Sequence, residues 1–244
     1  MRFCRALIGR LLPRSVRHGL RQLAHIFDLD ARLCWGQEGE DIVLRELFAG
    51  QKKGFYVDVG AHHPTRYSNT YYFYTQGWRG LNIDAMPGSM KKFIQTRPRD
   101  INVEAAVSKN EVDLVYHIFN IGAVNTFDEE KALEAINSGN FKLISKTTIR
   151  TRKLIDLLNR HLPAGTRIDF MSVDVEGLDL DVLESNDWEK YRPRVILIEL
   201  QRFCLDAPQS EPAYQYLIGK GYKVFSKLMN TVIFTDATFE FHLY

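Results

Sequence analysis

The stretch that decides the fold of this 244-residue chain is Phe55-Tyr56-Val57-Asp58-Val59-Gly60-Ala61-His62-His63. Its aromatic and β-branched residues predict a buried strand. Gly60 predicts a tight turn in which the backbone passes close to a ligand. The dinucleotide fingerprint G-x-G-x-x-G and the Walker A motif are both absent, which excludes those two kinds of nucleotide site. An acid at the end of a buried strand, with glycine two residues on, indicates a different small-molecule site.

The same pattern recurs along the chain. Apolar runs at residues 79–84, 168–174 and 194–200 also carry acids at their ends, and helical patterns separate the runs. A further strand is expected at 101–107, and strands at 222–226 and 231–235 form a C-terminal antiparallel hairpin. This alternation predicts an α/β fold with a Rossmann-like, mostly parallel sheet.

Two segments do not follow the alternation. Residues 1–35 form a basic extension: six arginines and no acid lie within residues 1–27, among apolar residues that favour amphipathic helices. The extension either docks on an anionic membrane surface or a partner protein, or packs on the domain with its arginines solvated. Residues 108–150 read as an irregular insertion, with a strand at 112–119, a loop at 121–127 and a polar stretch at 128–146. Such an insertion is either a lid or specificity segment or a surface excursion.

Composition limits the functional classes. The net charge is +2, and residues 1–27 contribute six positive charges, so the rest of the chain carries a net charge of −4. A nucleic-acid substrate is excluded, because proteins that bind nucleic acid need a basic surface. The three cysteines are widely spaced, which favours a reducing cytoplasm over a disulfide or zinc framework. No apolar run of spanning length occurs. We therefore expect a cytoplasmic protein, peripheral at the inner face of the membrane if residues 1–27 dock there.

Carboxylates gather in the predicted sheet because the carboxyl ends of parallel strands meet at one edge. They are Asp58, Asp84, Asp174, Glu176 and Glu199. Any one of them alone could be the N-cap of the following helix. Asp84 lies 26 residues after Asp58, where doubly wound sheets place the carboxylate that binds ribose hydroxyls. Together with Asp58-x-Gly60, this arrangement indicates binding of S-adenosylmethionine (SAM).

Candidate proton acceptors lie close to these strand ends. His62 and His63 follow the glycine turn, and an imidazole titrates near neutral pH. We expect one of the two to face the ligand and the other to pack or face solvent. Asp174 and Glu176 are the other candidates for a general base. Alternatively, Asp174, Glu176 and Glu199 bind Mg²⁺, which would acidify a bound hydroxyl group, or simply shape the pocket.

The chain resembles the FkbM-type SAM-dependent methyltransferases from about residue 36 to residue 199. The resemblance rests on these motifs: Gln37-x-x-Glu40-Asp41, Val57-Asp58-Val59-Gly60-Ala61, Ser68-Asn69-Thr70, Gly77-Trp78-Arg79-Gly80-x-x-Ile83-Asp84-Ala85, Asn125-Thr126-Phe127 and Ser172-x-Asp174-Val175-Glu176-Gly177. It implies a class I methyltransferase fold with a seven-stranded sheet over residues 36–244, and O-methylation of sugar hydroxyls in glycans, lipopolysaccharide or glycosylated metabolites.

The resemblance also assigns roles to individual residues. Asp58, Gly60 and Ala61 would cradle the methionine part of SAM, with Gln37 close by, and Asp84 would hold the ribose. Ala85, Ala105 and Ala106 would line the adenine slot. The acceptor is then a small molecule or a glycan. A different reading is a non-catalytic module of the same fold, which docks through its basic extension to a glycan-assembly complex.

Overall fold

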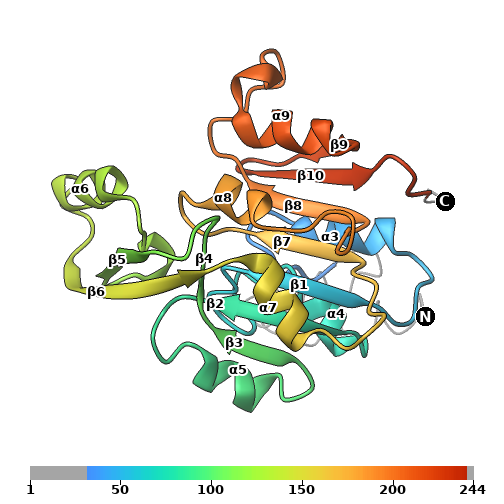
Figure 1. Cartoon of the computed structure of the whole chain (residues 1–244), viewed down its shortest axis with the longest axis horizontal. Helices are drawn as coiled ribbons and strands as arrows, with labels where there is room; N and C mark the ends of the chain where they lie inside the picture. The colour runs from blue at the N-terminus through green and yellow to red at the C-terminus, as the bar shows by residue number, and fades with distance from the viewer. Residues whose placement is uncertain (1–31, 241–244) are drawn as a thin grey trace, which may run out of the picture. The chain divides into compact units, whose positions relative to one another are not determined.

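The computed structural model describes residues 32–240 (Figure 1). The chain divides into two units, residues 1–34 and 35–244, and only the second is described below. Most of the predicted basic extension, residues 1–31, lies outside the described residues. Within the described part no helix is long and apolar enough to cross a membrane.

A seven-stranded sheet forms the centre of the second unit, in the order β3-β2-β1-β7-β8-β10-β9. The strands are β1 (Phe55–Val59), β2 (Arg79–Asp84), β3 (Ile101–Glu104), β7 (Phe170–Val173), β8 (Val195–Glu199), β9 (Tyr222–Lys227) and β10 (Thr231–Asp236). The first five pair in parallel, and β10 is antiparallel to both β8 and β9. The predicted mostly parallel sheet with a C-terminal antiparallel hairpin is confirmed.

The order of the strands locates a ligand site. The chain moves outward from β1 through β2 to β3 and then returns to β7 on the other side of β1. In open α/β sheets, ligands bind beyond the carboxyl ends of the strands at such a reversal. The ends of β1 and β7 are therefore where the functional site is expected.

Helices cover both faces of the sheet because alternate strand residues point to opposite sides. On one face, α3 (Glu40–Leu47) and α4 (Tyr71–Thr75) pack against Tyr56 and Phe170. On the other face, α7 (Leu154–His161), α8 (Asp179–Glu184) and α9 (Pro212–Gly219) pack against Val57 and Val59. Near the β3 edge, α5 (Met90–Thr96) buries Met90 and Phe93 against Ala61. The loop after β8 contains the short helix η2 (Pro208–Ser210).

Residues 108–152 form an ordered arm, seen on the left of Figure 1. The arm contains β5 (Asp113–Phe119), η1 (Gly122–Val124), α6 (Glu129–Asn137) and β6 (Leu143–Arg152). Together with β4 (Ala106–Val107), its strands make a second sheet in the order β4-β6-β5. The strand expected near 112–119 is confirmed as β5.

Three expectations for this region are wrong. The expected single strand at 101–107 is interrupted at Ala105, and its second part, β4, belongs to the second sheet. The polar stretch at 128–146 holds α6, which begins because the Asp128 carboxylate accepts two backbone N–H groups, and the start of β6. The apolar residues Leu154, Ile155, Leu157 and Leu158 predict a helix over Thr151–Leu162, but this helix, α7, begins at Leu154 because Thr151 and Arg152 pair with β4.

Candidate active site

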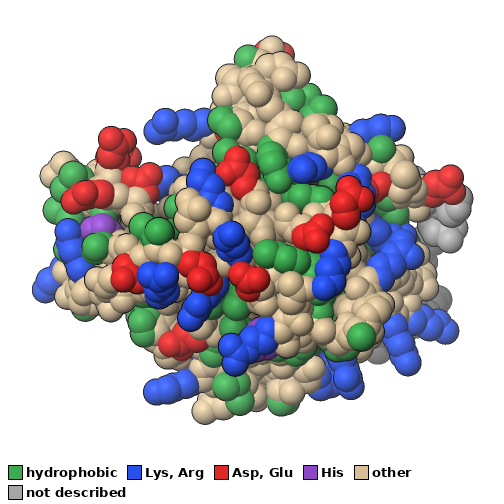
Figure 2. All heavy atoms as spheres, viewed as in Figure 1, with side chains coloured by type: hydrophobic (Ala, Val, Ile, Leu, Met, Phe, Trp, Pro, Cys, Tyr) green, Lys and Arg blue, Asp and Glu red, His purple; other side chains and the backbone are tan. Residues whose placement is uncertain are grey.

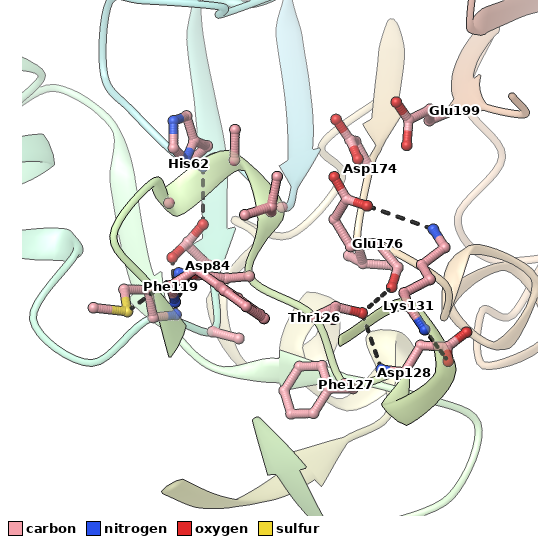
Figure 3. Close-up of a pocket in the computed structure, with 18 of the residues that line it drawn as sticks. His62, Asp84, Phe119, Thr126, Phe127, Asp128, Lys131, Asp174, Glu176 and Glu199 are labelled. Atoms are coloured by element: carbon pink, nitrogen blue, oxygen red, sulfur yellow. Dashed lines mark hydrogen bonds and ion pairs between the residues drawn. The ribbon is translucent and has the colours of Figure 1, made fainter. Parts of the chain in front are cut away.

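A cleft of about 1240 Å³ opens beyond the carboxyl ends of β1, β2, β7 and β8, with the arm as one wall (Figure 3). Ten of the residues singled out from the sequence line it: Gln37, Gly60, His62, His63, Asp84, Ala85, Ala105, Asp174, Glu176 and Glu199. Three others, Asp58, Ala61 and Ala106, do not line it and lie buried nearby. The cleft therefore brings together residues that are distant in the sequence.

Gly60 allows the ends of two strands to approach closely. Its φ angle is +86°, and a Cβ atom there would lie 1.7 Å from the backbone oxygen of Asp174. No other amino acid fits both constraints. The glycine thus sets the spacing between the ends of β1 and β7.

Asp84 holds the backbone around the cleft. The N–H of His62 donates to one carboxylate oxygen at 2.8 Å, and the N–H of Met86 donates to the other at 2.9 Å. A carboxylate offers about four lone-pair positions, so each oxygen keeps capacity for another donor. Ala85 and Ala105 line the cleft beside it with small side chains. This end of the cleft can accept two hydroxyl donors next to a flat space.

Asp58 points away from the cleft because it lies on the same strand face as Tyr56. Its carboxylate accepts the hydroxyl of Thr70 at 2.8 Å, and the fully buried Arg97 donates to Thr70 at 3.0 Å. Burial raises the pKa of Asp58 to about 6, against the opposing effect of Arg97. Asp58 therefore anchors the segment after β1 through its contact with Thr70 and does not face the cleft.

The two alanines outside the cleft have simple structural reasons for their position. Ala61 is turned into the cluster formed by Met90 and Phe93 on α5. Ala106 is the first residue of β4 and is buried where the arm begins. Of the three residues expected to line the adenine slot, Ala85 and Ala105 line the cleft and Ala106 does not.

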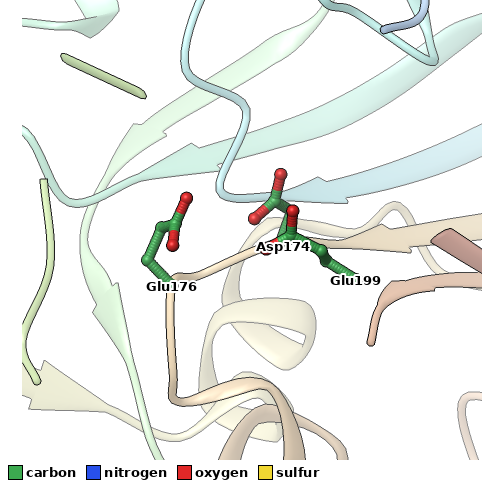
Figure 4. A group of neighbouring side chains, drawn as sticks. All are labelled: Asp174, Glu176 and Glu199. Carbon is green, nitrogen blue, oxygen red and sulfur yellow. The ribbon is translucent and has the colours of Figure 1, made fainter. Parts of the chain in front are cut away.

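Asp174, Glu176 and Glu199 form an acidic triad on the other side of the cleft (Figure 4). One carboxylate oxygen from each lies within 4.8 Å of the other two. The cleft walls desolvate Asp174 and raise its pKa well above the ordinary value, and Glu199 and Glu176 raise it further. Desolvation also raises the pKa of Glu176 to about 7, with Glu199 adding to the effect and Lys131 opposing it. Desolvation and the crowding of three acids therefore favour the protonated forms of Asp174 and Glu176 more than in an isolated carboxyl group.

The turn that carries Glu176 is tightly held. Asp179 accepts the backbone N–H groups of Val175 at 3.1 Å and Gly177 at 3.2 Å. Glu176 itself has a φ angle of 54°. The other non-glycine residues with positive φ in the described part are His62 and Tyr67, and all three line the cleft. Unusual backbone conformations gather at functional sites, because the surrounding structure stabilises them there.

The two histidines have different surroundings. His62 is exposed to the cleft beside Asp84, and a Cβ on Gly122 of the arm would lie only 3.2 Å from its Cε1. Nδ1 of His63 accepts the backbone N–H groups of Thr65 at 3.2 Å and Arg66 at 3.1 Å. The ring of His63 thus caps its own loop, and protonation at Nδ1 would break both contacts. Of these two histidines, His62 is the one whose ring faces the cleft without such backbone contacts.

The arm supplies residues that sequence patterns did not assign to the site. Thr126 donates its hydroxyl to the backbone oxygen of Glu176 at 2.8 Å, and Lys131 pairs with the Glu176 carboxylate at 3.5 Å. Figure 3 shows both reaching across to the 176 turn. The Asn125-Thr126-Phe127 motif signalled the first contact. No sequence signal marked Lys131, because its role depends on α6 folding within a stretch that reads as irregular.

Comparison with known proteins identifies the family. Residues 58–224 match the methyltransferase FkbM domain, and the chain belongs to this family. A search of curated proteins gives no significant match.

Solved structures with a similar arrangement are methyltransferases of low sequence identity. A TehB-like SAM-dependent methyltransferase from Corynebacterium glutamicum has a TM-score of 0.43 at 10% identity, covering 91% of this chain and 96% of that one. A precorrin-6y C5,15-methyltransferase from Geobacter metallireducens has a TM-score of 0.41 at 14% identity, and the match covers 85% of this chain and 93% of that one. An O-methyltransferase from Bacillus cereus in complex with SAH has a TM-score of 0.41 at 12% identity, and the match covers 94% of each chain.

The protein is a SAM-dependent methyltransferase with the predicted fold. The described residues fit the cofactor. The spare lone pairs of the Asp84 carboxylate suit two ribose hydroxyls, and the small side chains of Ala85 and Ala105 leave room for a flat base.

Proposed function

We propose that this protein methylates a hydroxyl oxygen, with a sugar of a glycan, lipopolysaccharide or glycosylated metabolite as the acceptor. The observation that carries the proposal is the acidic triad, which faces the same cleft as Asp84. A hydroxyl nucleophile must lose its proton, and a carboxylate at the cleft wall can take it. SAM supplies an electrophilic methyl group on a sulfonium, so the protein has mainly to orient the acceptor and accept that proton.

We assign the proton acceptor to Glu176 rather than to a histidine. His62 is held on the β2 side of the cleft by its N–H contact with Asp84, and His63 caps its own loop. Glu176 lies across the cleft from His62, near the arm (Figure 3). A carboxyl group with a pKa near 7 can both accept and release a proton under physiological conditions. His62 is the competing assignment and is tested beside Glu176 below.

The same acids support a second proposal, binding of Mg²⁺. Three carboxylates are the oxygen donors that Mg²⁺ prefers, and they would hold the ion together with water. In that case Asp174, Glu176 and Glu199 would be ligands and the ion would acidify the acceptor hydroxyl. Sensitivity of methyl transfer to a chelator, restored by added Mg²⁺, separates this proposal from the metal-free base.

A methylation screen tests the proposed reaction. Purified protein with labelled SAM is offered sugar nucleotides, lipid-linked oligosaccharides and polysaccharides, and mass spectrometry locates any transferred methyl group. Transfer to a sugar oxygen is expected. Transfer to nitrogen or carbon would contradict the proposal, and SAM binding without transfer to any acceptor would favour the non-catalytic docking module.

Cofactor binding is expected to depend on Asp84. The Asp84→Ala variant removes a charged acceptor for ribose hydroxyls and leaves two backbone N–H groups without their partner. Losing charge-assisted hydrogen bonds of about 1.5–3 kcal/mol should raise the Kd for SAM about 10–150-fold by calorimetry. Asp113→Ala is the matched control, since this exposed acid at the start of β5 lies outside the cleft lining and pairs with Arg150 on the surface. Parental affinity in Asp84→Ala would refute the cofactor placement.

The exclusion of nucleic acid as a partner stays a proposal. Figure 2 supports it, because acidic and basic side chains are interspersed over the centre of the face shown. A continuous basic stripe would be expected of a nucleic-acid reader.

We also propose that residues 1–27 localise a cytoplasmic enzyme to an anionic membrane surface. Their six arginines, without any acid, support this. Deleting them should abolish co-sedimentation with anionic liposomes and leave turnover of a water-soluble acceptor unchanged. Unaltered liposome binding would reject membrane docking, and an insoluble product would favour a helix packed on the domain.

A further inference from the structure

Four basic or titratable side chains line the cleft on the Asp84 side and take no part in the chemistry proposed above. They are His62, His63 and Arg66 from the loop after β1, and Lys92 from α5. Burial lowers the pKa of both imidazoles first of all; Asp84 opposes this at His62, and Arg66 and Lys92 lower both further. The two cations therefore lie near both rings, and we refer to the four residues as the cationic cluster.

Asp84 is the acid next to the cluster, through its contact with the His62 backbone, but within residues 32–240 the two cations of the cluster have no ion-pair partner. Lys131 across the cleft, by contrast, is paired with Glu176. The fourth cation of the cleft, Arg202, comes from the loop after β8 and is not among the charges that act on the two histidines. Cations that converge in a concave site without neutralisation concentrate anions there.

The loop backbone that carries His63 and Arg66 is also held in place before any ligand arrives. The loop is fixed at His63, whose ring accepts the backbone N–H groups of Thr65 and Arg66. The two ends of this loop are fixed by Arg97, which donates to the Thr70 hydroxyl at 3.0 Å and to the backbone oxygen of Pro64 at 3.5 Å. A preformed loop binds at a lower entropic cost than one that must become ordered.

We propose that the cationic cluster is an anion subsite that binds a phosphate group of the acceptor. Two full positive charges match a phosphate monoester, which carries about −1.5 to −2 charges near pH 7. The planar guanidinium of Arg66 suits two phosphate oxygens, and the ammonium of Lys92 acts as a point charge. This inference rests on the proposed transfer to an acceptor, and it narrows the acceptor to phosphorylated sugars and sugar nucleotides.

The loop also links the subsite to the acidic triad. Tyr67, directly after Arg66, lines a small adjoining cavity together with Asp174 and Glu199. One short loop therefore spans from the cations to the acids. An acceptor held by its phosphate at the cluster can extend along this loop and present a hydroxyl group to the triad.

The test uses glucose 1-phosphate as the probe and methyl glucoside as its neutral counterpart. Binding to the full chain, saturated with S-adenosylhomocysteine, is measured by calorimetry. Glucose 1-phosphate should bind, inorganic phosphate should compete with it, and the neutral sugar should not. Affinity should fall as ionic strength rises from roughly 20 to 200 mM, because salt screens exposed charges.

The double variant Arg66→Ala/Lys92→Ala should raise the Kd for glucose 1-phosphate at least about tenfold, since hydrogen bonds to charged groups are lost. The matched control is Arg79→Ala/Lys91→Ala, which removes the same two residue types outside the cleft lining: Arg79 begins β2, at the end of the strand opposite Asp84, and Lys91 is on α5. The control should bind the probe like the parent. Circular dichroism and a melting curve establish that both variants fold.

Each contrary result has a distinct meaning. Equal losses of affinity in the double variant and its control, or no binding of the probe to the parent, overturn the subsite. An equal weakening of SAM binding in the double variant also overturns it, because the cluster would then serve the cofactor carboxylate. Phosphate binding without methyl transfer to any acceptor refutes the proposed function but leaves the subsite standing.

Discussion

Replacing Glu176 with Gln is expected to lower kcat by about 10²–10⁴-fold, the usual contribution of a general base. The amide has a similar shape but cannot accept the acceptor proton. In the parent, kcat should rise with pH through about 7, because the carboxyl group is raised to that pKa and works only when ionised. The pH–rate profile of the residual activity should lose this rising limb, while the Kd for SAM stays near the parental value.

Two companion variants make the Glu176 result decisive. His62→Ala removes the competing imidazole and should leave kcat within a few-fold of the parent. If His62→Ala instead loses activity by the stated factor and Glu176→Gln does not, the base is His62. Asp174→Asn and a chelator titration complete the set, since loss of activity on chelation that Mg²⁺ restores would assign the acids to metal binding.

Gly60→Ala should abolish SAM binding and strongly destabilise the fold. The added Cβ would lie 1.7 Å from the backbone oxygen of Asp174, so the ends of β1 and β7 must move apart. A positive φ costs an L-residue about 1–2 kcal/mol and overpacking about 1–3 kcal/mol, so the free energy of unfolding should fall by about 2–5 kcal/mol. Thermal or denaturant unfolding measures the loss.

Gly77→Ala provides the matched control. Gly77 has a φ angle of +91°, but no atom lies within 4 Å of its would-be Cβ. This variant should lose only the conformational term, about 1–2 kcal/mol, and keep SAM binding. Equal destabilisation in both variants would mean that the close approach at Asp174 is not a constraint on the site.

The fold could be predicted from the sequence because each parallel strand of the sheet combines an apolar run with an acid at or next to its end. The pattern at Val57-Asp58-Val59-Gly60 and its repeat near Asp174 predicted two strands, and the structure pairs them in parallel at the centre of the sheet. The terminal hairpin followed from two strands too close together for a crossover helix.

The arm could not be predicted to the same degree. Asp128 caps α6 with two backbone contacts, but Asp is equally common in turns, and the helix after it is mostly polar. Most of the second strand of the arm, β6, is solvent-exposed, so its sequence lacks the alternation that a buried face imposes. Tertiary pairing with β5 decides its conformation.

The orientation of single side chains was the hardest to foresee. Asp58 appears in a ligand-binding motif, yet the two-residue period of β1 turns it toward Thr70 and away from the cleft. His63 was equivalent to His62 in the sequence, and only the loop geometry commits its Nδ1 to backbone contacts. Lys131 reaches Glu176 through tertiary packing alone.

The way the arm joins the sheet has an evolutionary consequence. The arm departs directly after β4 and returns along β6, and the paired residues Ala106 and Thr151, with Val107 and Arg152, bring departure and return side by side. A segment whose two ends already meet can be lengthened, shortened or exchanged at small entropic expense to its host. Residues 108–152 can therefore vary between related proteins, and with them the choice of acceptor, without a change in the central sheet or the cofactor loop.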